Sequence, residues 1–173
     1  MSVLNVVLYP DDPLTRKAAP YEKIGPGVAK LAEDMLETMH AHDGVGLAGP
    51  QVGISKRIFV MQPPDGEALC LVNPEILKME GGVEGEEGCL SIPRVYSDRV
   101  PRASWIEVKG FDETGSPVHF EAKDFLARII QHEYDHLEGK FFFDRLDIIS
   151  RDAVLAEWKT VRAELDSLDE RVG

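Results

Sequence analysis

The sequence contains few cysteines and no long apolar run. Its 173 residues include only Cys70 and Cys89, whereas secreted domains stapled by disulfides carry more cysteines in shorter chains. At least one of these thiols is therefore expected to have another role. No apolar stretch approaches the roughly 20 residues of a membrane helix, and the run of residues 6–8 is too short for a signal peptide. We therefore expect a cytoplasmic protein without membrane contact.

Basic residues are outnumbered as well. The chain has 19 lysines and arginines against 31 aspartates and glutamates, which gives a formal net charge of -12. Such a surface repels nucleic-acid phosphates, so autonomous nucleic-acid binding is not expected. The hydrophobic and charged fractions are those of ordinary globular proteins. We expect residues 1–173 to form a single domain.

Three segments have helical periodicity. Apolar residues recur at steps of three and four in residues 27–39, 123–138 and 147–172, and Gly139 is placed to end the second helix. The second helix carries more apolar residues than a one-sided helix needs, so we expect it at the centre of the fold. The third helix is expected to pack through one stripe, formed by Val154, Trp158, Val161, Leu165 and Leu168.

The middle of the chain has shorter segments, rich in β-branched or aromatic residues and separated by turn motifs. We expect strands at residues 57–61, 69–72, 76–79, 105–111 and 117–120. The segment 80–88, rich in glycine and glutamate, is expected to be a loop. The predicted fold class is α+β, with mixed or antiparallel sheets around the central helix and a C-terminal helix at 147–172.

The second predicted helix carries the sequence His132-Glu133-Tyr134-Asp135-His136. Residues four apart lie on one helix face, so both imidazoles can reach a single metal ion while Glu133 meets a water beside it. Such a histidine pair also occurs by chance on surface helices. Here the flanking apolar residues predict burial, where an unpaired imidazole pair is costly.

A catalytic metal site of this kind uses three protein ligands. A metzincin would need a histidine at position 142, where this chain has Phe142. A thermolysin-like peptidase would use a downstream glutamate, for which Glu157 is the candidate. Cys89 is the other candidate, because its flanking glycine lets a thiolate approach without crowding. The residues alone do not decide whether Glu157 or Cys89 is the third metal ligand.

Residues 44–49 have the glycine spacing of a dinucleotide-binding fingerprint. That fingerprint follows a strand and opens a helix, but here a helix comes before it and Pro50 directly after it. We interpret the segment instead as a glycine-rich turn that lets a peptide backbone come close.

Three motifs together resemble the signature motifs of the peptide deformylases: residues 44–51 (GVGLAGPQ), 87–91 (EGCLS) and 131–136 (QHEYDH). Residues 8–14 also look like the family's start, so the resemblance covers essentially the whole chain. One departure is Gly49, where the family usually has alanine. This change removes a methyl group in a turn already rich in glycine, so we expect activity to survive it.

The resemblance implies a hydrolase that removes the formyl group from the N-formylmethionine of newly made polypeptides and nascent chains. It implies one divalent metal ion held by Cys89, His132 and His136, usually Fe²⁺, with Zn²⁺, Ni²⁺ or Co²⁺ as alternatives. Three further residues are then catalytic: Glu133 as the proton shuttle, and the side-chain amide of Gln51 with the backbone N–H of Leu90 as donors to the oxyanion.

The resemblance also implies that the substrate main chain pairs with the turn like an added strand. The candidate substrate-binding residues are Gly44, Val45, Gly46, Leu126 and Ile129. Packing does not explain Arg128, and its role stays open between a contact with substrate and one with an acidic partner.

Some bacterial deformylases dock their terminal helix on the ribosome. Residues 147–173 here hold seven acidic and four basic residues, so we expect any such contact to be weak and transient or directed at ribosomal protein. Two rival functions stay open at this point: a thermolysin-like metallopeptidase that uses Glu157, and a non-catalytic deformylase-like protein.

Overall fold

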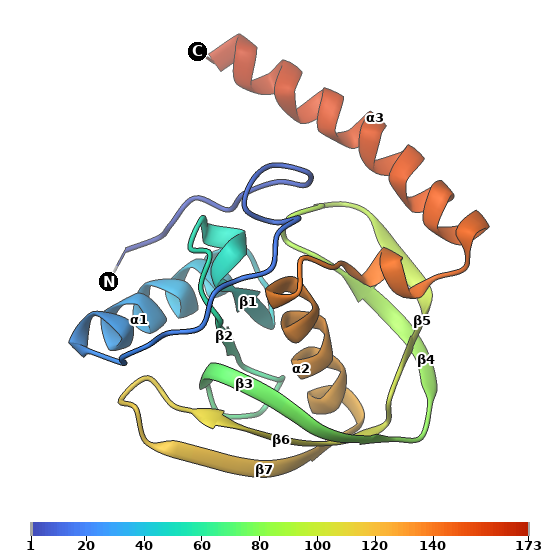
Figure 1. Cartoon of the computed structure of the whole chain (residues 1–173). Coiled ribbons are helices and arrows are strands. Elements are labelled where there is room, and N and C mark those ends of the chain that lie inside the picture. The colour runs from blue at the N-terminus through green and yellow to red at the C-terminus, as the bar shows by residue number, and fades with distance from the viewer. Residues whose placement is uncertain (1, 173) are drawn as a thin grey trace.

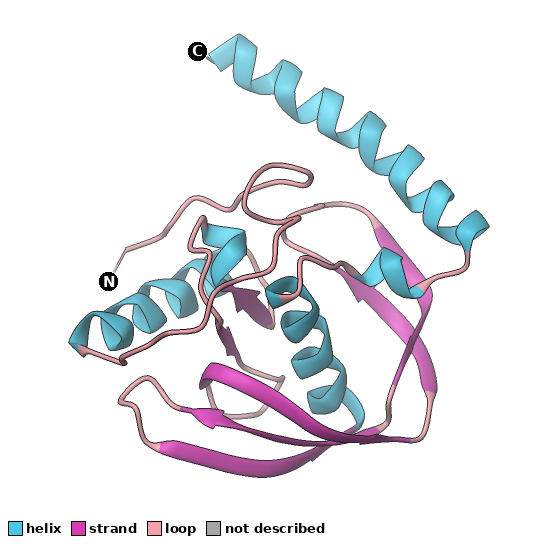
Figure 2. Ribbon diagram, viewed as in Figure 1, coloured by secondary structure: helices cyan, strands magenta, loops and turns pink. Residues whose placement is uncertain are grey.

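The computed structural model describes residues 2–172, where two α-helices and seven strands surround a third, central helix (Figures 1 and 2). The helices are α1 (Pro26–Ala41), the central α2 (Asp124–Leu137) and α3 (Ile148–Val172). The strands are β1 (Gly46–Ala48), β2 (Ile58–Met61), β3 (Leu69–Glu80), β4 (Val83–Gly88), β5 (Tyr96–Arg102), β6 (Trp105–Phe111) and β7 (Pro117–Lys123). The α+β class, the sheets around a central helix and the C-terminal helix are as predicted.

Five strands form one antiparallel sheet in the order β1-β2-β3-β6-β7, and β4 with β5 forms a separate antiparallel ribbon. Helix α2 lies between the sheet and the ribbon (Figure 1). It ends where the sequence predicts, because Gly139 adopts a φ of 72°, a conformation that costs a glycine little.

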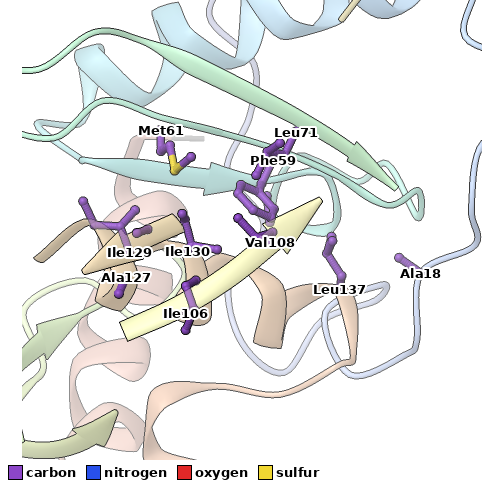
Figure 3. Close-up of a cluster of buried hydrophobic side chains, with 12 residues drawn as sticks. Ala18, Phe59, Met61, Leu71, Ile106, Val108, Ala127, Ile129, Ile130 and Leu137 are labelled. Carbon is purple, nitrogen blue, oxygen red and sulfur yellow. The ribbon is translucent and has the colours of Figure 1, made fainter. Parts of the chain in front are cut away.

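The face of α2 toward the sheet is apolar. Figure 3 shows Ala127, Ile129 and Ile130 of the helix directed at side chains of β2, β3 and β6. All three helix residues are at most 3% exposed. This packing fixes α2 against the sheet and leaves its other faces for polar residues.

Strand β3 corrects one sequence prediction. Residues 69–72 and 76–79 were expected to be two strands separated by Asn73-Pro74, but they belong to one strand with a register shift between Val72 and Glu75. Asn73 takes a φ of 49°, which asparagine tolerates well, and its side-chain amide bonds the backbone N–H and C=O of Tyr21. The Asn-Pro pair therefore bends the strand without ending it.

The ribbon corrects a second prediction. Residues 80–88 were expected to be a loop, but they contain the end of β3 and all of β4. β4 lacks alternating apolar residues because most of its side chains face solvent, while Glu87 is buried. A strand that buries a carboxylate in place of a hydrophobic residue gives no periodic signal in the sequence.

Helix α3 runs across one end of the molecule (Figure 1). Val154 and Trp158 are buried and Val161 and Leu165 are partly buried, whereas Leu168 is 47% exposed, so the predicted stripe packs only in its first part. The indole N–H of Trp158 donates to the backbone carbonyl of Tyr9 at 2.9 Å. None of the helices in residues 2–172 has the length and apolar character needed to span a membrane.

Candidate metal centre

Two histidines of α2 and one cysteine after β4 converge on one point. The Nε2 atoms of His132 and His136 are 3.3 Å apart, and Nε2 of His136 is 3.3 Å from Sγ of Cys89. All three donor atoms lie within 4.8 Å of one another. Tetrahedral coordination at usual metal–nitrogen distances separates two nitrogen ligands by about 3.3 Å. The spacing is therefore that of a metal site.

The ribbon brings Cys89 to the helix. Cys89 directly follows β4, where Gly88 pairs with Tyr96 of β5. A Cβ atom on residue 88 would lie 2.5 Å from the Tyr96 ring, so this close crossing needs a glycine. The partly buried thiol then reaches the two imidazoles.

The His132 ring is oriented by a carboxylate. Its Nδ1 is 2.7 Å from Oε1 of Glu87. An ionised carboxylate only accepts hydrogen bonds, so Nδ1 carries the hydrogen and the Nε2 lone pair faces Cys89 and His136. The pKa of Glu87 is lowered: burial opposes ionisation, but hydrogen bonds from Arg102 and His132 outweigh it.

The donor set fits a borderline divalent cation. Two imidazole nitrogens and one sulfur meet in a buried place. Although burial opposes the charge, the neighbouring Glu133, Cys89 and Glu87 raise the pKa of His132 well above its ordinary value, and a bound cation would take the place of its proton. Burial and the neighbouring His132 lower the pKa of His136 well below its ordinary value, which favours the neutral imidazole that a metal requires. Two nitrogens and one thiolate suit Fe²⁺, Co²⁺, Ni²⁺ and Zn²⁺.

Glu133 adjoins the three donors. It is buried, its Oε2 is 3.9 Å from Nε2 of His132, and its Oε1 has no hydrogen-bond partner among the described residues. Burial raises its pKa to about 7, and a divalent charge beside it would act in the opposite direction. A carboxylate in this setting can accept and release a proton near neutral pH.

A cavity of about 560 Å³ opens onto these groups. The predicted site residues that line this cavity are Gly44, Val45, Gly46, Gln51, Cys89, Leu90, Ile129, His132 and Glu133. Leu126 does not line it and packs against the core between α2 and the sheet. Tyr96 and Phe125, exposed aromatic residues at the cavity, were not predicted because nothing in their local sequence points to it.

Gln51 presents its amide to the same place. Its Oε1 accepts a hydrogen bond from the backbone N–H of Ala48 at 2.9 Å, which fixes the orientation of the amide. Nε2 then lies 3.2 Å from Oγ of Ser91 and 3.4 Å from Sγ of Cys89. The N–H donors of Gln51 are therefore aimed at the metal centre.

The structure gives Arg128 acidic and backbone partners within the chain and separates the candidate third ligands. Arg128 is 7% exposed and donates to Glu87 and to the backbone carbonyls of Val83 and Val100, so it joins α2 to the ribbon. Glu157 is exposed on α3 and does not belong to the donor cluster.

Comparison with known proteins agrees with this geometry. Residues 3–152 match the model of the polypeptide deformylase family. A peptide deformylase of Syntrophomonas wolfei is 50% identical over 146 residues, which cover 84% of this chain and 94% of the relative. Another from Alkalilimnicola ehrlichii is 43% identical over 171 residues, or 97% of this chain and 92% of the relative.

Solved structures of peptide deformylases are also similar to this one. The peptide deformylase of Thermus thermophilus superposes with a TM-score of 0.87 at 46% identity, covering 99% of this chain and 100% of that one. The enzyme from Legionella pneumophila superposes with a TM-score of 0.88 at 36% identity, covering 95% and 98%.

Proposed function

Since this chain belongs to the peptide deformylase family, it is a hydrolase that removes the N-formyl group from newly synthesised polypeptides, and we propose that Cys89, His132 and His136 hold its metal ion. One observation carries the proposal: a sulfur and two imidazole nitrogens lie within 4.8 Å of one another beside a buried carboxylate. Formylmethionine is the proposed terminal residue of the substrate, and formate is the released product.

Fe²⁺ is the proposed native ion, with Zn²⁺, Ni²⁺ and Co²⁺ as substitutes, because the donor set is compatible with all four. When bound, the cation lowers the pKa of a coordinated water toward about 7 and polarises the formyl carbonyl.

The neighbouring groups transfer the proton and stabilise the oxyanion. Glu133 takes the proton of the attacking water and returns it to the departing amine, which is a poor leaving group until it is protonated. In support, Oε1 of Glu133 is buried and has no hydrogen-bond partner among the described residues, so its lone pairs are available to a proton donor. The amide of Gln51 and the backbone N–H of Leu90 donate to the formyl oxygen as it becomes negative.

The substrate main chain pairs with the Gly44–Gly46 segment. In support, β1 is the outer strand of the five-stranded sheet, so within residues 2–172 one side of it has no neighbouring strand in that sheet. Pairing through the backbone gives affinity without sequence selection, which suits an enzyme that acts on many polypeptides. The methionine side chain is received between Val45 and Ile129, which line the cavity.

The cellular setting is part of the proposal. The whole chain acts as one domain in the cytoplasm, where nascent chains emerge. With seven acidic and four basic residues in positions 147–173, contact with the ribosome is weak and transient.

The test is anaerobic purification, metal analysis and an assay of formate release from a formyl-Met peptide. Cys89→Ala should lose bound metal and activity, because a three-ligand site is left with two. Cys70→Ala is the matched control, since Cys70 is a buried core residue outside the cluster, and it should keep both. Glu133→Gln should keep metal and lose turnover. A Cys89→Ala protein that retains metal and releases formate would refute the ligand assignment.

A further inference from the structure

The carboxylate of Glu87, which orients His132, accepts hydrogen bonds at both of its oxygens. Oε1 of Glu87 accepts from His132 and from Arg102 at 2.9 Å, and Oε2 accepts from Arg102 at 2.8 Å and from Arg128 at 2.6 Å. Each oxygen therefore has two donors. The position of the His132 ring depends on this carboxylate, and the carboxylate depends on two arginines.

Arg102 connects Glu87 to a second carboxylate. Its side chain is 2% exposed, and its third hydrogen bond runs from Nη1 to Oδ2 of Asp135 at 2.6 Å. Asp135 lies on α2 between the two proposed histidine ligands, and its side chain is 4% exposed. One guanidinium thus lies between two buried carboxylates. A change at either carboxylate therefore alters how strongly the guanidinium is held by the other.

Asp135 is in turn held by Arg145, which ends the 3₁₀ turn η2 (Phe142–Arg145). Nη2 of Arg145 donates to Oδ1 at 2.6 Å and Nε donates to Oδ2 at 3.0 Å, a two-pronged contact. The Arg145 side chain is 43% exposed. It lines a different cavity, of about 880 Å³, together with Arg102, Gln131 and Asp135.

We propose that Arg145 is a positioning residue for the metal centre. It acts through Asp135, Arg102 and Glu87 on His132, so alternating charges link an accessible surface to a metal ligand. The inference rests on the proposed function, because it requires His132 to bind metal. Arg145 lines the second cavity and is not among the residues that line the cavity of the metal centre, so its effect must pass through the linked side chains.

Removing the Arg145 guanidinium leaves Arg102 as the remaining arginine on Asp135. Arg102 is then drawn toward Asp135, which weakens its hold on Glu87 and loosens the His132 ring. Losing an outer partner of a metal ligand typically costs about 10–100-fold in metal affinity. Because Arg145 is partly exposed and solvent screens its charge, the effect should be about 10-fold, the lower end of that range.

The experiment compares Arg145→Ala, Arg145→Lys and Arg151→Ala with the unchanged protein. Zn²⁺ affinity is measured by competition with a chelating dye, and the ligand field is read from the visible spectrum of the Co²⁺-substituted protein. Arg151 is the matched control: it is a 39% exposed arginine paired with Asp144 at 3.3 Å, and no bond joins it to Asp135 in the described residues.

Arg145→Ala should weaken Zn²⁺ binding about tenfold and shift the Co²⁺ spectrum, whereas Arg151→Ala should change neither. Arg145→Lys keeps the charge but loses the two-pronged contact, so it should restore part of the affinity. Unchanged affinity and spectrum in Arg145→Ala would overturn the proposal.

If Arg145→Ala does not fold, Arg145→Lys decides alone. A shifted Co²⁺ spectrum in that variant supports the positioning role, and an unshifted one overturns it in favour of a purely structural role. Failure of the proposed function is distinguishable, because then Cys89→Ala would bind Zn²⁺ as tightly as the unchanged protein.

Discussion

Gly46 and Glu133 approach so closely that a Cβ atom on residue 46 would lie 2.5 Å from Oε2 of Glu133. The sequence suggested that the glycines of this turn admit a substrate backbone. The structure adds a second reason for Gly46, because the proposed proton shuttle occupies the space that any larger residue would need.

Gly46→Ala should therefore displace Glu133 and leave the proposed metal ligands in place. General acid–base groups contribute about 10²–10⁴ in rate, so we expect kcat to fall by at least about 10² with unchanged metal content. Both are measured on one preparation, by formate release and metal analysis. Gly27→Ala is the control, since a Cβ there meets nothing within 4 Å. A Gly46→Ala variant with normal kcat would show that Glu133 does not need its present position.

Gln51→Met should remove the proposed oxyanion donor while keeping a side chain of similar length. Loss of one such donor typically costs about 10²–10³ in rate, so kcat should fall by that factor. The comparison is Gln62→Met, because Gln62 bonds His40 and the backbone of Gly66 and does not line the metal-centre cavity. Equal steady-state rates for the two variants would remove Gln51 from the mechanism.

Gly49→Ala is expected to destabilise the protein. A Cβ at this position would lie 2.8 Å from the backbone carbonyl oxygen of Ile54 and 2.9 Å from that of Lys56. Judged from the sequence, glycine at position 49 only lacks the methyl group that alanine would have. In the structure, two backbone carbonyl oxygens occupy the space that this methyl group would need. Overpacking of this kind lowers the free energy of unfolding by about 1–3 kcal/mol. In a protein of this size, each kcal/mol lost lowers Tm by roughly 2–4 °C. Thermal unfolding of the metal-free protein measures it; a Tm equal to that of Gly27→Ala would contradict the expectation.

The two cysteines should differ in reactivity. Burial raises the pKa of Cys70 to about 12, so only about one part in 10⁴ is thiolate at pH 8. Cys89 should be protected by bound metal and react with iodoacetamide once a chelator has removed it. Mass spectrometry of digested samples locates the adduct. Modification of Cys70 before Cys89 in chelator-treated protein would show that the pKa argument is wrong.

Elements with strong periodicity were predicted well. The sequence placed α1 at 27–39 and the structure has Pro26–Ala41, while β6 has the predicted ends. In both cases the burial pattern repeats over several residues, and that repetition is what sequence analysis detects.

The ribbon and the charged chain could not be found in this way. Glu87, Arg102 and Asp135 are far apart in the sequence and meet only when β4, β5 and α2 pack together. A buried arginine between two carboxylates looks, in sequence, like three solvated residues. The motif at residues 87–91 contains Glu87, but the hydrogen bond that orients His132 forms only once β4 and α2 pack together.

The β4–β5 ribbon has a thermodynamic consequence. Two strands alone are marginally stable, and this pair is joined to α2 by the side chains of Arg102 and Arg128. A metal ion held as proposed by Cys89, His132 and His136 would join the ribbon to the helix a second time. Ion binding and ordering of the ribbon are then linked by mass action. Amide hydrogens of residues 83–102 should exchange faster when the ion is withdrawn, so the metal-free enzyme would be a form that proteases can recognise.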